Sequence, residues 1–152
     1  MRALIIVDVQ KDFCEGGALP VPGARAVSRS ISDYLAGDPG SAGVEFASEL
    51  DTEPIEAVFR KGAYGAGYSG FEGVDENGMS LSDWLRQQGV DAVDVAGLAT
   101  DHCVRRTAHD AARAGLVPRV LLDLTAGVSA AAIDHMLHKT RNANIELIGK
   151  HP

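Results

Sequence analysis

Three side chains of this 152-residue sequence could together carry nucleophilic chemistry: a cysteine, a carboxylate and a lysine. Cys103 lies between an apolar run at residues 92–96 and a stretch with helical spacing, so we expect it at a strand-to-helix turn. In the first turn of a helix, unpaired backbone N–H groups and the positive end of the dipole favour the thiolate over the thiol. Considered alone, however, a cysteine is more often a small buried apolar side chain.

Asp8 and Lys61 change that interpretation. Asp8 ends the apolar run at residues 3–7, and Lys61 follows the run at residues 57–59. A carboxylate at the end of a buried strand is costly to desolvate unless it is paired, and a lysine at another strand end could pair with it. A purely structural ion pair remains the alternative. If the fold brings Cys103 to the same place, an arrangement of nucleophile, base and cation is the better interpretation.

The elements that must position these residues alternate between strand and helix patterns. Apolar runs of strand length occur at residues 3–7, 57–59, 92–96, 119–124 and 144–148. Helical spacing occurs between them, and Ser129 is a candidate N-cap. Such alternation predicts an α/β protein, a three-layer α/β/α fold with a mainly parallel sheet. Ligands of such sheets bind beyond the carboxyl ends of the strands, where all three candidate residues would converge.

Composition narrows the class of protein further, and the length fits a single domain over residues 1–152. Fourteen basic and 21 acidic residues give a formal charge of −7, and no basic patch is longer than two residues, so a nucleic-acid partner is disfavoured. No apolar run approaches the roughly 18 residues of a membrane span, so no membrane partner is expected. The N-terminal apolar run is too short for a secretory signal, which predicts a cytoplasmic protein with reduced thiols at Cys14 and Cys103.

Two strings around the candidate residues resemble a known family. Residues 8–13, Asp-Val-Gln-Lys-Asp-Phe, and residues 97–104, Gly-Leu-Ala-Thr-Asp-His-Cys-Val, are similar to the nicotinamidase/pyrazinamidase branch of the isochorismatase-like cysteine hydrolases. The resemblance continues through residues 61–64, 68–78 and 123–129, and it covers nearly the whole chain except residues 37 to 52. It implies hydrolysis of nicotinamide to nicotinate and ammonia, with pyrazinamide as a second substrate. It also implies a place in NAD salvage, a small-molecule substrate and a monomer or small homo-oligomer.

The resemblance also implies roles for individual residues. Asp8 would be the general base that takes the proton of Cys103 and later returns it to departing ammonia, with Lys61 holding Asp8 ionised. Cys103 would attack the carboxamide carbon and form a thioester. The oxyanion hole would use the backbone N–H groups of Ala99 and Cys103, next to a cis peptide between Leu98 and Ala99. The substrate pocket would be lined by Phe13, Tyr68 and Leu98. For the two aromatic residues, plain core packing is the alternative.

One part of the family pattern has no counterpart in this sequence. The resemblance implies a divalent metal (zinc, iron or manganese) held by an Asp-x-His pair and further histidines on a second strand and its loop. No histidine precedes His102, so no metal ligand can be assigned. We interpret His102 as shaping the site rather than as its base. His135 and His138 are three residues apart on an expected helix, where a solvated helix face is a simpler interpretation than a metal site.

The missing segment, which includes the family's second strand and metal loop, would lie close to residues 35–37. Either it is truly deleted, or the natural polypeptide contains it and the printed sequence does not. A deletion would leave a gap of one strand spacing, about 4.8 Å, between the strands bearing Asp8 and Lys61, with unpaired backbone groups on both sides. This expectation favours the second explanation.

Two other functions fit the same residues. An N-carbamoyl amide hydrolase of the same superfamily would share the three catalytic residues but accept aliphatic substrates. A metal-less inactive homologue would keep the fold and lose the activity. Comparing nicotinamide with a carbamoyl amino acid as substrates separates the first alternative, and rapid alkylation of Cys103 near neutral pH argues against the second.

Overall fold

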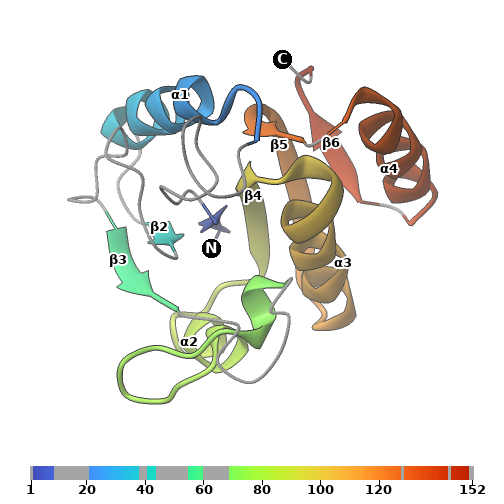
Figure 1. Ribbon diagram of the computed structural model, residues 1–152. Helices are drawn as coiled ribbons and strands as arrows, with labels where there is room; N and C mark the ends of the chain where they lie inside the picture. The colour runs from blue at the N-terminus through green and yellow to red at the C-terminus, as the bar shows by residue number, and fades with distance from the viewer. Residues whose placement is uncertain are drawn as a thin grey trace.

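The computed structural model describes residues 2–8, 21–37, 41–43, 55–59, 69–127, 129–143 and 145–150. Strands and helices alternate along the chain (Figure 1). In chain order the elements are β1 (Arg2–Val7), α1 (Ala24–Gly37), β2 (Ser41–Gly43), β3 (Ile55–Val58), the 3₁₀ turn η2 (Gly70–Glu72), α2 (Leu81–Gln87), β4 (Ala92–Leu98), the π-type turn η3 (Thr100–Val104), α3 (Arg105–Arg113), β5 (Val117–Ala126), α4 (Ala130–Asn142) and β6 (Glu146–Ile148). All five predicted strands are confirmed, each within two residues of the expected bounds.

The six strands form one sheet in the order β3-β2-β1-β4-β5-β6, and every adjacent pair is parallel. Figure 1 shows the strands in a row between α1 on one side and α2 on the other. A parallel sheet needs a crossover between successive strands, which is why the helices cover both of its faces. The predicted three-layer α/β/α fold is confirmed.

Side-chain alternation along the strands sorts the core into two clusters. Odd-numbered residues of β1 point to the face covered by α2 and α3, and even-numbered ones point to the face covered by α1. The first cluster includes Ala3, Ile5, Val7, Val93, Val95, Leu81, Leu85, Val104, Ala108 and Ala111. The second includes Leu4, Ile6, Ala24, Val27, Ile31, Ala96, Leu98 and Leu121. Because the central strands are buried on both faces, they contain long apolar runs rather than alternating ones.

The helix beginnings follow the capping signals in the sequence. Ser129 is the N-cap of α4, where its side chain accepts a hydrogen bond from the Ala132 N–H, as predicted. Ser80 caps α2 in the same way through the Asp83 N–H. The helical stretch of α3 is followed by Gly115 at φ +86°, a conformation that favours glycine.

The sheet has no empty position between β1 and β3, and the expected gap is therefore wrong. Residues Ser41–Gly43 form a short strand there, which pairs with β1 through Leu4↔Ser41, Ile5↔Ala42 and Ile6↔Gly43. The same three residues pair with β3 on their other side. The chain after α1 thus supplies a strand of its own, although three residues extend only about 10 Å along the sheet. Unpaired strands are consequently no argument against a true deletion.

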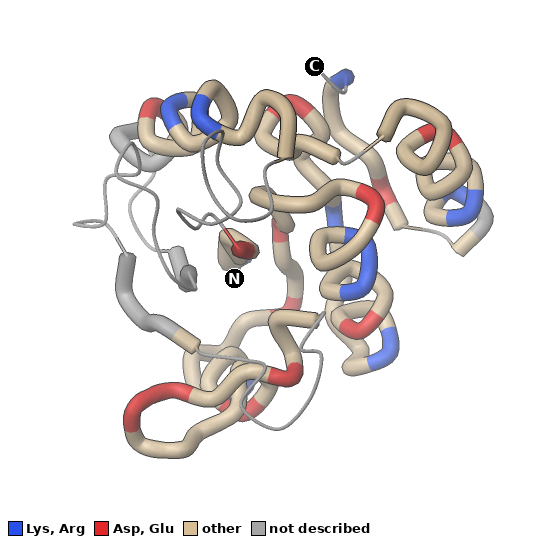
Figure 2. The backbone as a smooth tube through the Cα atoms, viewed as in Figure 1, with Lys and Arg blue, Asp and Glu red and all other residues tan. Residues whose placement is uncertain are grey.

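Charges are spread over the described part of the chain. Figure 2 shows basic residues on several helices, with acidic residues between them rather than a continuous basic stripe. Among the described residues, no helix is both long enough and apolar enough to span a membrane.

Candidate active site

The end of β1 lies directly against the end of β4. Val7 is the register partner of Gly97, and Asp8 follows Val7 at this edge of the sheet. Gly97 has φ +113°, and a Cβ built on it would stand 2.7 Å from the Val7 nitrogen and closer still to the Val7 carbonyl oxygen. Only glycine allows the two backbones to approach this closely. The glycine therefore brings the strand end that carries Asp8 against the segment that leads to Cys103.

Asp8 is held in an unusual place for a carboxylate. It is 3% exposed, and it has φ +51° in the left-handed region, which few residues other than glycine adopt. Backbone strain of this kind is maintained only where the surrounding structure determines it, and it clusters at functional sites. The buried carboxylate predicted for this strand end is confirmed.

The segment after β4 turns sharply into a helix. The Leu98–Ala99 peptide bond is cis, as the resemblance implies. The Ala99 carbonyl then accepts hydrogen bonds from the His102 and Val104 N–H groups, each at 3.1 Å. The second of these bonds spans five residues and makes the turn wider than an α-helical one.

The wide turn presents two side chains while it buries its others. Thr100, Asp101 and Val104 are buried, whereas Cys103 is half-buried and the His102 side chain is 53% exposed. Cys103 forms no disulfide with another described residue and packs against the core on one side, and α3 continues directly from its turn. Its position at the start of a helical stretch favours the thiolate.

The structure thus places four of the predicted site residues at one edge of the sheet: Asp8, Leu98, Ala99 and Cys103. Leu98 is fully buried in the core on the α1 side, which is a packing position. The other predicted residues, Lys61, Phe13 and Tyr68, lie outside the described residues, so their roles remain predictions.

Sequence reasoning did not identify Thr107 as part of this site. Its side chain is fully buried on α3, four residues after Cys103, and it bonds both to the Cys103 carbonyl and to the distant Gly70 N–H. The spacing of four residues was visible in the sequence, but nothing there indicates the contact with Gly70, because that contact joins positions 37 residues apart.

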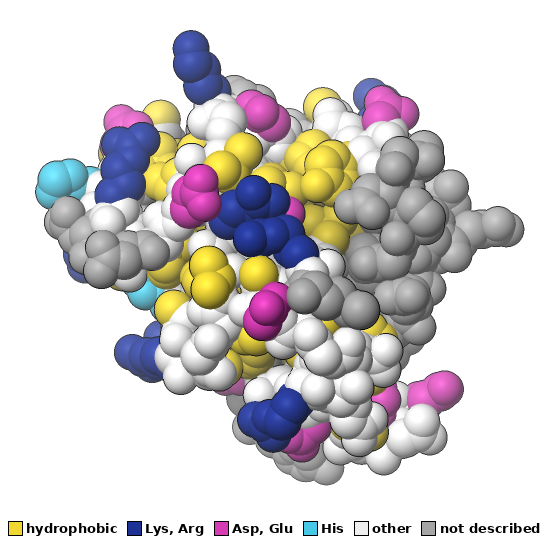
Figure 3. All heavy atoms as spheres, turned by 180° about the vertical axis from the view of Figure 1, so that it is seen from behind, with side chains coloured by type: hydrophobic (Ala, Val, Ile, Leu, Met, Phe, Trp, Pro, Cys, Tyr) yellow, Lys and Arg dark blue, Asp and Glu magenta, His cyan; other side chains and the backbone are white. Residues whose placement is uncertain are grey.

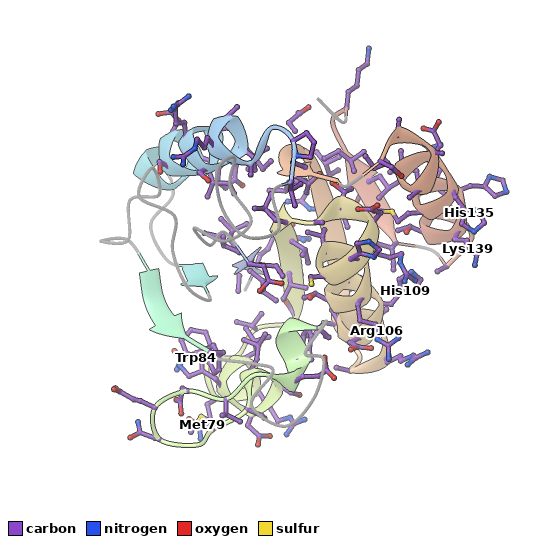
Figure 4. All side chains as sticks on the ribbon, in the orientation of Figure 1. Met79, Trp84, Arg106, His109, His135 and Lys139 are labelled. Carbon is purple, nitrogen blue, oxygen red and sulfur yellow. The ribbon has the colours of Figure 1, made fainter. Side chains whose placement is uncertain are left out.

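The residues present do not fit the metal site that the resemblance implies. The sequence has no histidine before His102, and Ser41, Ala42 and Gly43, which form the strand beside β1, have no metal-binding imidazole or carboxylate. Over the described ranges, no three His, Cys, Asp or Glu side chains converge on a point that could hold a metal ion. His135 and His138 are exposed on α4, and Figure 4 shows His135 and Lys139 projecting away from the sheet.

Comparisons with known proteins agree with this geometry. The isochorismatase domain model matches residues 33–151. The nicotinamidase/pyrazinamidase of Mycobacterium tuberculosis is 53% identical over 183 positions, which cover 97% of this chain and 98% of the relative. The nicotinamidase of Escherichia coli is 30% identical over 84% of each chain. Since 183 aligned positions exceed the 152 residues here by 31, at least 31 positions of the M. tuberculosis protein have no counterpart in this chain.

Solved structures show the same fold. The L. infantum protein PnC1, in complex with nicotinate, has a TM-score of 0.85 at 29% identity and covers 97% of this chain and 92% of its own. The pyrazinamidase of Pyrococcus horikoshii, in complex with zinc, has a TM-score of 0.81 at 26% identity and covers 97% and 98%. The domain model that matches residues 33–151 and the relative that is 53% identical over nearly the whole chain lead to one conclusion: the chain belongs to the isochorismatase family.

Proposed function

We propose that this protein is an amidohydrolase that converts nicotinamide to nicotinate and ammonia, and pyrazinamide to pyrazinoate, through a thioester on Cys103. The observation that carries the proposal is the Val7↔Gly97 register, because it puts buried Asp8 and the turn bearing Cys103 at the same edge of the sheet. The 53% identity to a nicotinamidase/pyrazinamidase supports the substrate class.

In the first half of the reaction, Asp8 takes the proton of the Cys103 thiol and the sulfur attacks the carboxamide carbon. The carbonyl π bond opens, which places a negative charge on oxygen. The backbone N–H groups of Ala99 and Cys103 are the proposed donors to this oxyanion. When the carbonyl re-forms, the C–N bond breaks and the proton held by Asp8 goes to the nitrogen, so that ammonia leaves and a thioester remains.

In the second half, Asp8 takes a proton from water, and the hydroxide attacks the thioester carbon. The C–S bond then breaks, the carboxylic acid is released, and the proton on Asp8 passes to the Cys103 sulfur, which regenerates both groups. Lys61 is proposed to pair with Asp8 and hold it ionised, while Phe13 and Tyr68 are proposed to contact the ring of the substrate. Leu98, the third residue expected in the pocket, is fully buried in the core and does not present its side chain to the ring. The metal-binding half of the site does not fit the residues of this chain, so no step is assigned to a metal.

The proposal also covers the class of ligand, the location in the cell and the oligomeric state. The partner is a small amide, with neither nucleic acid nor membrane as a ligand, and the 152 residues act as one domain in the cytoplasm, as a monomer or small homo-oligomer. The acidic charge of −7 and the apolar core that covers both faces of the sheet support this description.

Replacing Cys103 by Ala tests the function directly. We expect nicotinate release to fall by about 10³-fold or more, because the bond-forming atom is lost. Nicotinate and ammonia are quantified from the purified protein, and circular dichroism verifies that the variant is folded. Cys14→Ala is the matched control, since it removes the chain's other thiol, and it should retain activity. Full amidase activity in Cys103→Ala would refute the mechanism.

Two further measurements separate the alternatives. Turnover of an N-carbamoyl amino acid in preference to nicotinamide would assign the protein to the carbamoyl amide hydrolases. An inactive protein whose Cys103 reacts slowly with iodoacetamide near pH 7 would instead be a binding or structural homologue, because a buried structural thiol is inert.

A further inference from the structure

The hydroxyl of Thr107 joins the nucleophile's turn to a segment far away in the sequence. Thr107 Oγ1 donates a hydrogen bond to the Cys103 carbonyl oxygen at 2.7 Å and accepts one from the Gly70 N–H at 2.9 Å. The side chain is 0% exposed, so water does not compete with either bond. Bonds linked through one hydroxyl polarise and strengthen each other, particularly in a dry environment.

This arrangement differs from ordinary hydroxyl bonding within a helix. Thr and Ser in helices commonly donate to the carbonyl four residues earlier, as Ser28 does to Ala24 at 2.8 Å in α1. Thr107 makes that bond and in addition receives one from outside its helix. A Cβ at Gly70 would lie 3.4 Å from the Thr107 methyl group, which is ordinary van der Waals contact, so the approach does not depend on the glycine.

The Ser69–Gly73 segment, to which Thr107 bonds, is held together by hydrogen bonds of its own. Ser69 accepts a hydrogen bond from the Phe71 N–H at 3.1 Å, and Glu72 accepts one from the Ser69 N–H at 2.8 Å. These two bonds form a capping box around η2. Figure 1 shows this short turn beside α3, and the two elements are in contact. Because these bonds close the turn on itself, the bond from the Gly70 N–H to Thr107 fixes the whole turn relative to α3.

We propose that Thr107 is a positioning residue that fixes the Ser69–Gly73 segment relative to the turn that bears Cys103. Its effect on kcat/KM rests on the proposed function, which assigns Tyr68, the residue before Ser69 in the sequence, to the ring pocket. Holding two reacting groups in a productive geometry is worth large factors in rate, and a displacement of about 1 Å can lower activity by about 10²-fold.

The test compares Thr107→Val, which keeps the shape and removes the hydroxyl, with Thr107→Ser, which keeps the hydroxyl. We expect kcat/KM for nicotinamide to fall about 10- to 100-fold in the Val variant and to stay within about threefold of the parent protein in the Ser variant. Alkylation of Cys103 by iodoacetamide should change by less than about twofold in either, because this small reagent does not require the ring pocket. Thr140→Val is the matched control, since Thr140 is equally buried and its hydroxyl, in the part of the chain that the structure describes, bonds to Met136 Sδ of its own helix.

A measurement that needs no substrate tests the positioning role independently of the proposed function. Amide hydrogen exchange over residues 69–73 should become faster in Thr107→Val and remain unchanged in Thr107→Ser. If the parent protein hydrolyses no nicotinamide, the proposed function fails, while exchange and alkylation still decide whether the hydroxyl fixes the segment.

Several results would overturn the proposal. Parent-like kcat/KM and exchange in the Val variant would show that the hydroxyl positions nothing, as would an equal loss in Thr140→Val. If Cys103 alkylation and nicotinamide turnover fell by the same factor, the effect would lie in the turn that bears Cys103 and not in the Ser69–Gly73 segment. Should the Val variant not fold, Thr107→Ala replaces it. If the Val and Ala variants both failed to fold while the Ser variant folded normally, the hydroxyl would be needed for folding, and the positioning role would be refuted.

Discussion

Gly97 is the residue on which the close contact between the strand ends depends. Its φ of +113° is strained for any residue with a side chain, and its Cα faces the backbone of Val7 on the neighbouring strand. The register with β5 shifts between Val95 and Gly97, where β4 advances by two residues and β5 by five, so the extra residues lie on β5. The pairing of β4 with β1 stays regular through Val7↔Gly97. A side chain here would push β1 and β4 apart where Asp8 and Cys103 must meet.

Replacing Gly97 by Ala is therefore expected to lower the free energy of unfolding by more than about 3 kcal/mol, since backbone strain and a backbone collision add together. Urea unfolding followed by circular dichroism measures the loss. Gly115→Ala is the control: it has φ +86° but nothing within 4 Å of the added Cβ, so only the strain of about 1–2 kcal/mol applies. Equal losses of unfolding free energy in the two variants would show that the added Cβ at residue 97 does not collide with the Val7 backbone.

At the level of single residues, the sequence predicted the parts of the site that follow from strand ends and helix starts. Asp8 at the end of β1, and Cys103 in the turn after β4, lie where the apolar runs indicated. The role of Thr107 could not be predicted, because the contact with Gly70 depends on how η2 packs against α3. A lone glycine inside a strand pattern, such as Gly97, signals a bulge or a close approach but not which backbone approaches it.

Among the elements, α3 carries a histidine whose charge state is linked to folding. His109 is half-buried, and its Nε2 has no hydrogen-bond partner among the described residues. Burial lowers the pKa of His109, and the positive charges of Arg105 and Arg113 lower it further, while Asp110 opposes them. Figure 4 shows His109 and Arg106 on this helix.

The lowered pKa predicts a stability change on the acid side. As pH falls below about 6.5, His109 takes up a proton in the unfolded chain before it does so in the folded one, which favours unfolding. The contribution is fully present above that pH and is lost as pH falls toward the lower folded-state pKa. Urea midpoints at pH 7.5 and pH 5.5 measure the effect. His109→Gln should show a smaller drop between the two values than the parent, whereas His138→Gln, at an exposed position of α4, should show the parental drop.

Three strands are joined by one carboxylate on the α1 face of the sheet. Asp94 of β4 accepts two hydrogen bonds from Arg119 of β5, at 2.7 and 2.8 Å, and one from Arg2 of β1 at 2.9 Å. Asp94 is buried, but the two arginine side chains are 36% and 30% exposed. The hydrogen bonds that Arg119 donates to Asp94 raise the pKa of Arg119. Figure 3 shows basic and acidic side chains set among hydrophobic ones on the far side of the molecule.

Asp94→Ala should lower the free energy of unfolding by about 2–4 kcal/mol, because three charge-assisted bonds are lost together. The exposed arginines can be rehydrated, which keeps the loss below that of fully buried charges. Chemical denaturation provides the measurement, and Asp83→Ala is the comparison. Asp83 pairs with Arg86 while both side chains are largely exposed, so its loss should stay within about 0.5 kcal/mol. A loss at Asp94 no larger than at Asp83 would show that the cluster does not hold the strands.

The strand that sequence patterns missed shows the limit of prediction for elements. Ser-Ala-Gly at residues 41–43 has neither the length nor the β-branched side chains of a predicted strand. It becomes β2 because β1 and β3 offer backbone partners on both sides, which is a tertiary effect that local pattern does not contain. The helices, by contrast, were predictable from capping residues such as Ser129 and from apolar spacing.

At the scale of the whole molecule, the sheet is paired most extensively at its centre. The β1–β4 and β4–β5 pairs have six register pairs each, whereas the outer pairs, β6 with β5 included, have three. β2 thus pairs through only three residues on each side. The half with β2 is the part of the fold where the resemblance places the metal-binding strand and loop. At least 31 aligned positions of the M. tuberculosis relative are absent from this chain, and Ser-Ala-Gly supplies none of the missing donors.

The donor set predicts that the 152-residue chain takes up no stoichiometric zinc. Zinc in proteins is held chiefly by imidazole and thiolate, and the five histidines of this sequence begin at His102. Protein of verified mass 16.0 kDa is incubated with zinc, passed through a desalting column and analysed for metal, with the P. horikoshii pyrazinamidase, whose structure contains zinc, as the positive control. One tightly held zinc per chain would contradict the prediction. Intact-mass measurement of the natural polypeptide then shows whether it contains the missing segment. If that polypeptide is several kilodaltons heavier, it contains the missing segment, and its zinc content should rise with its mass because the segment carries the ligands.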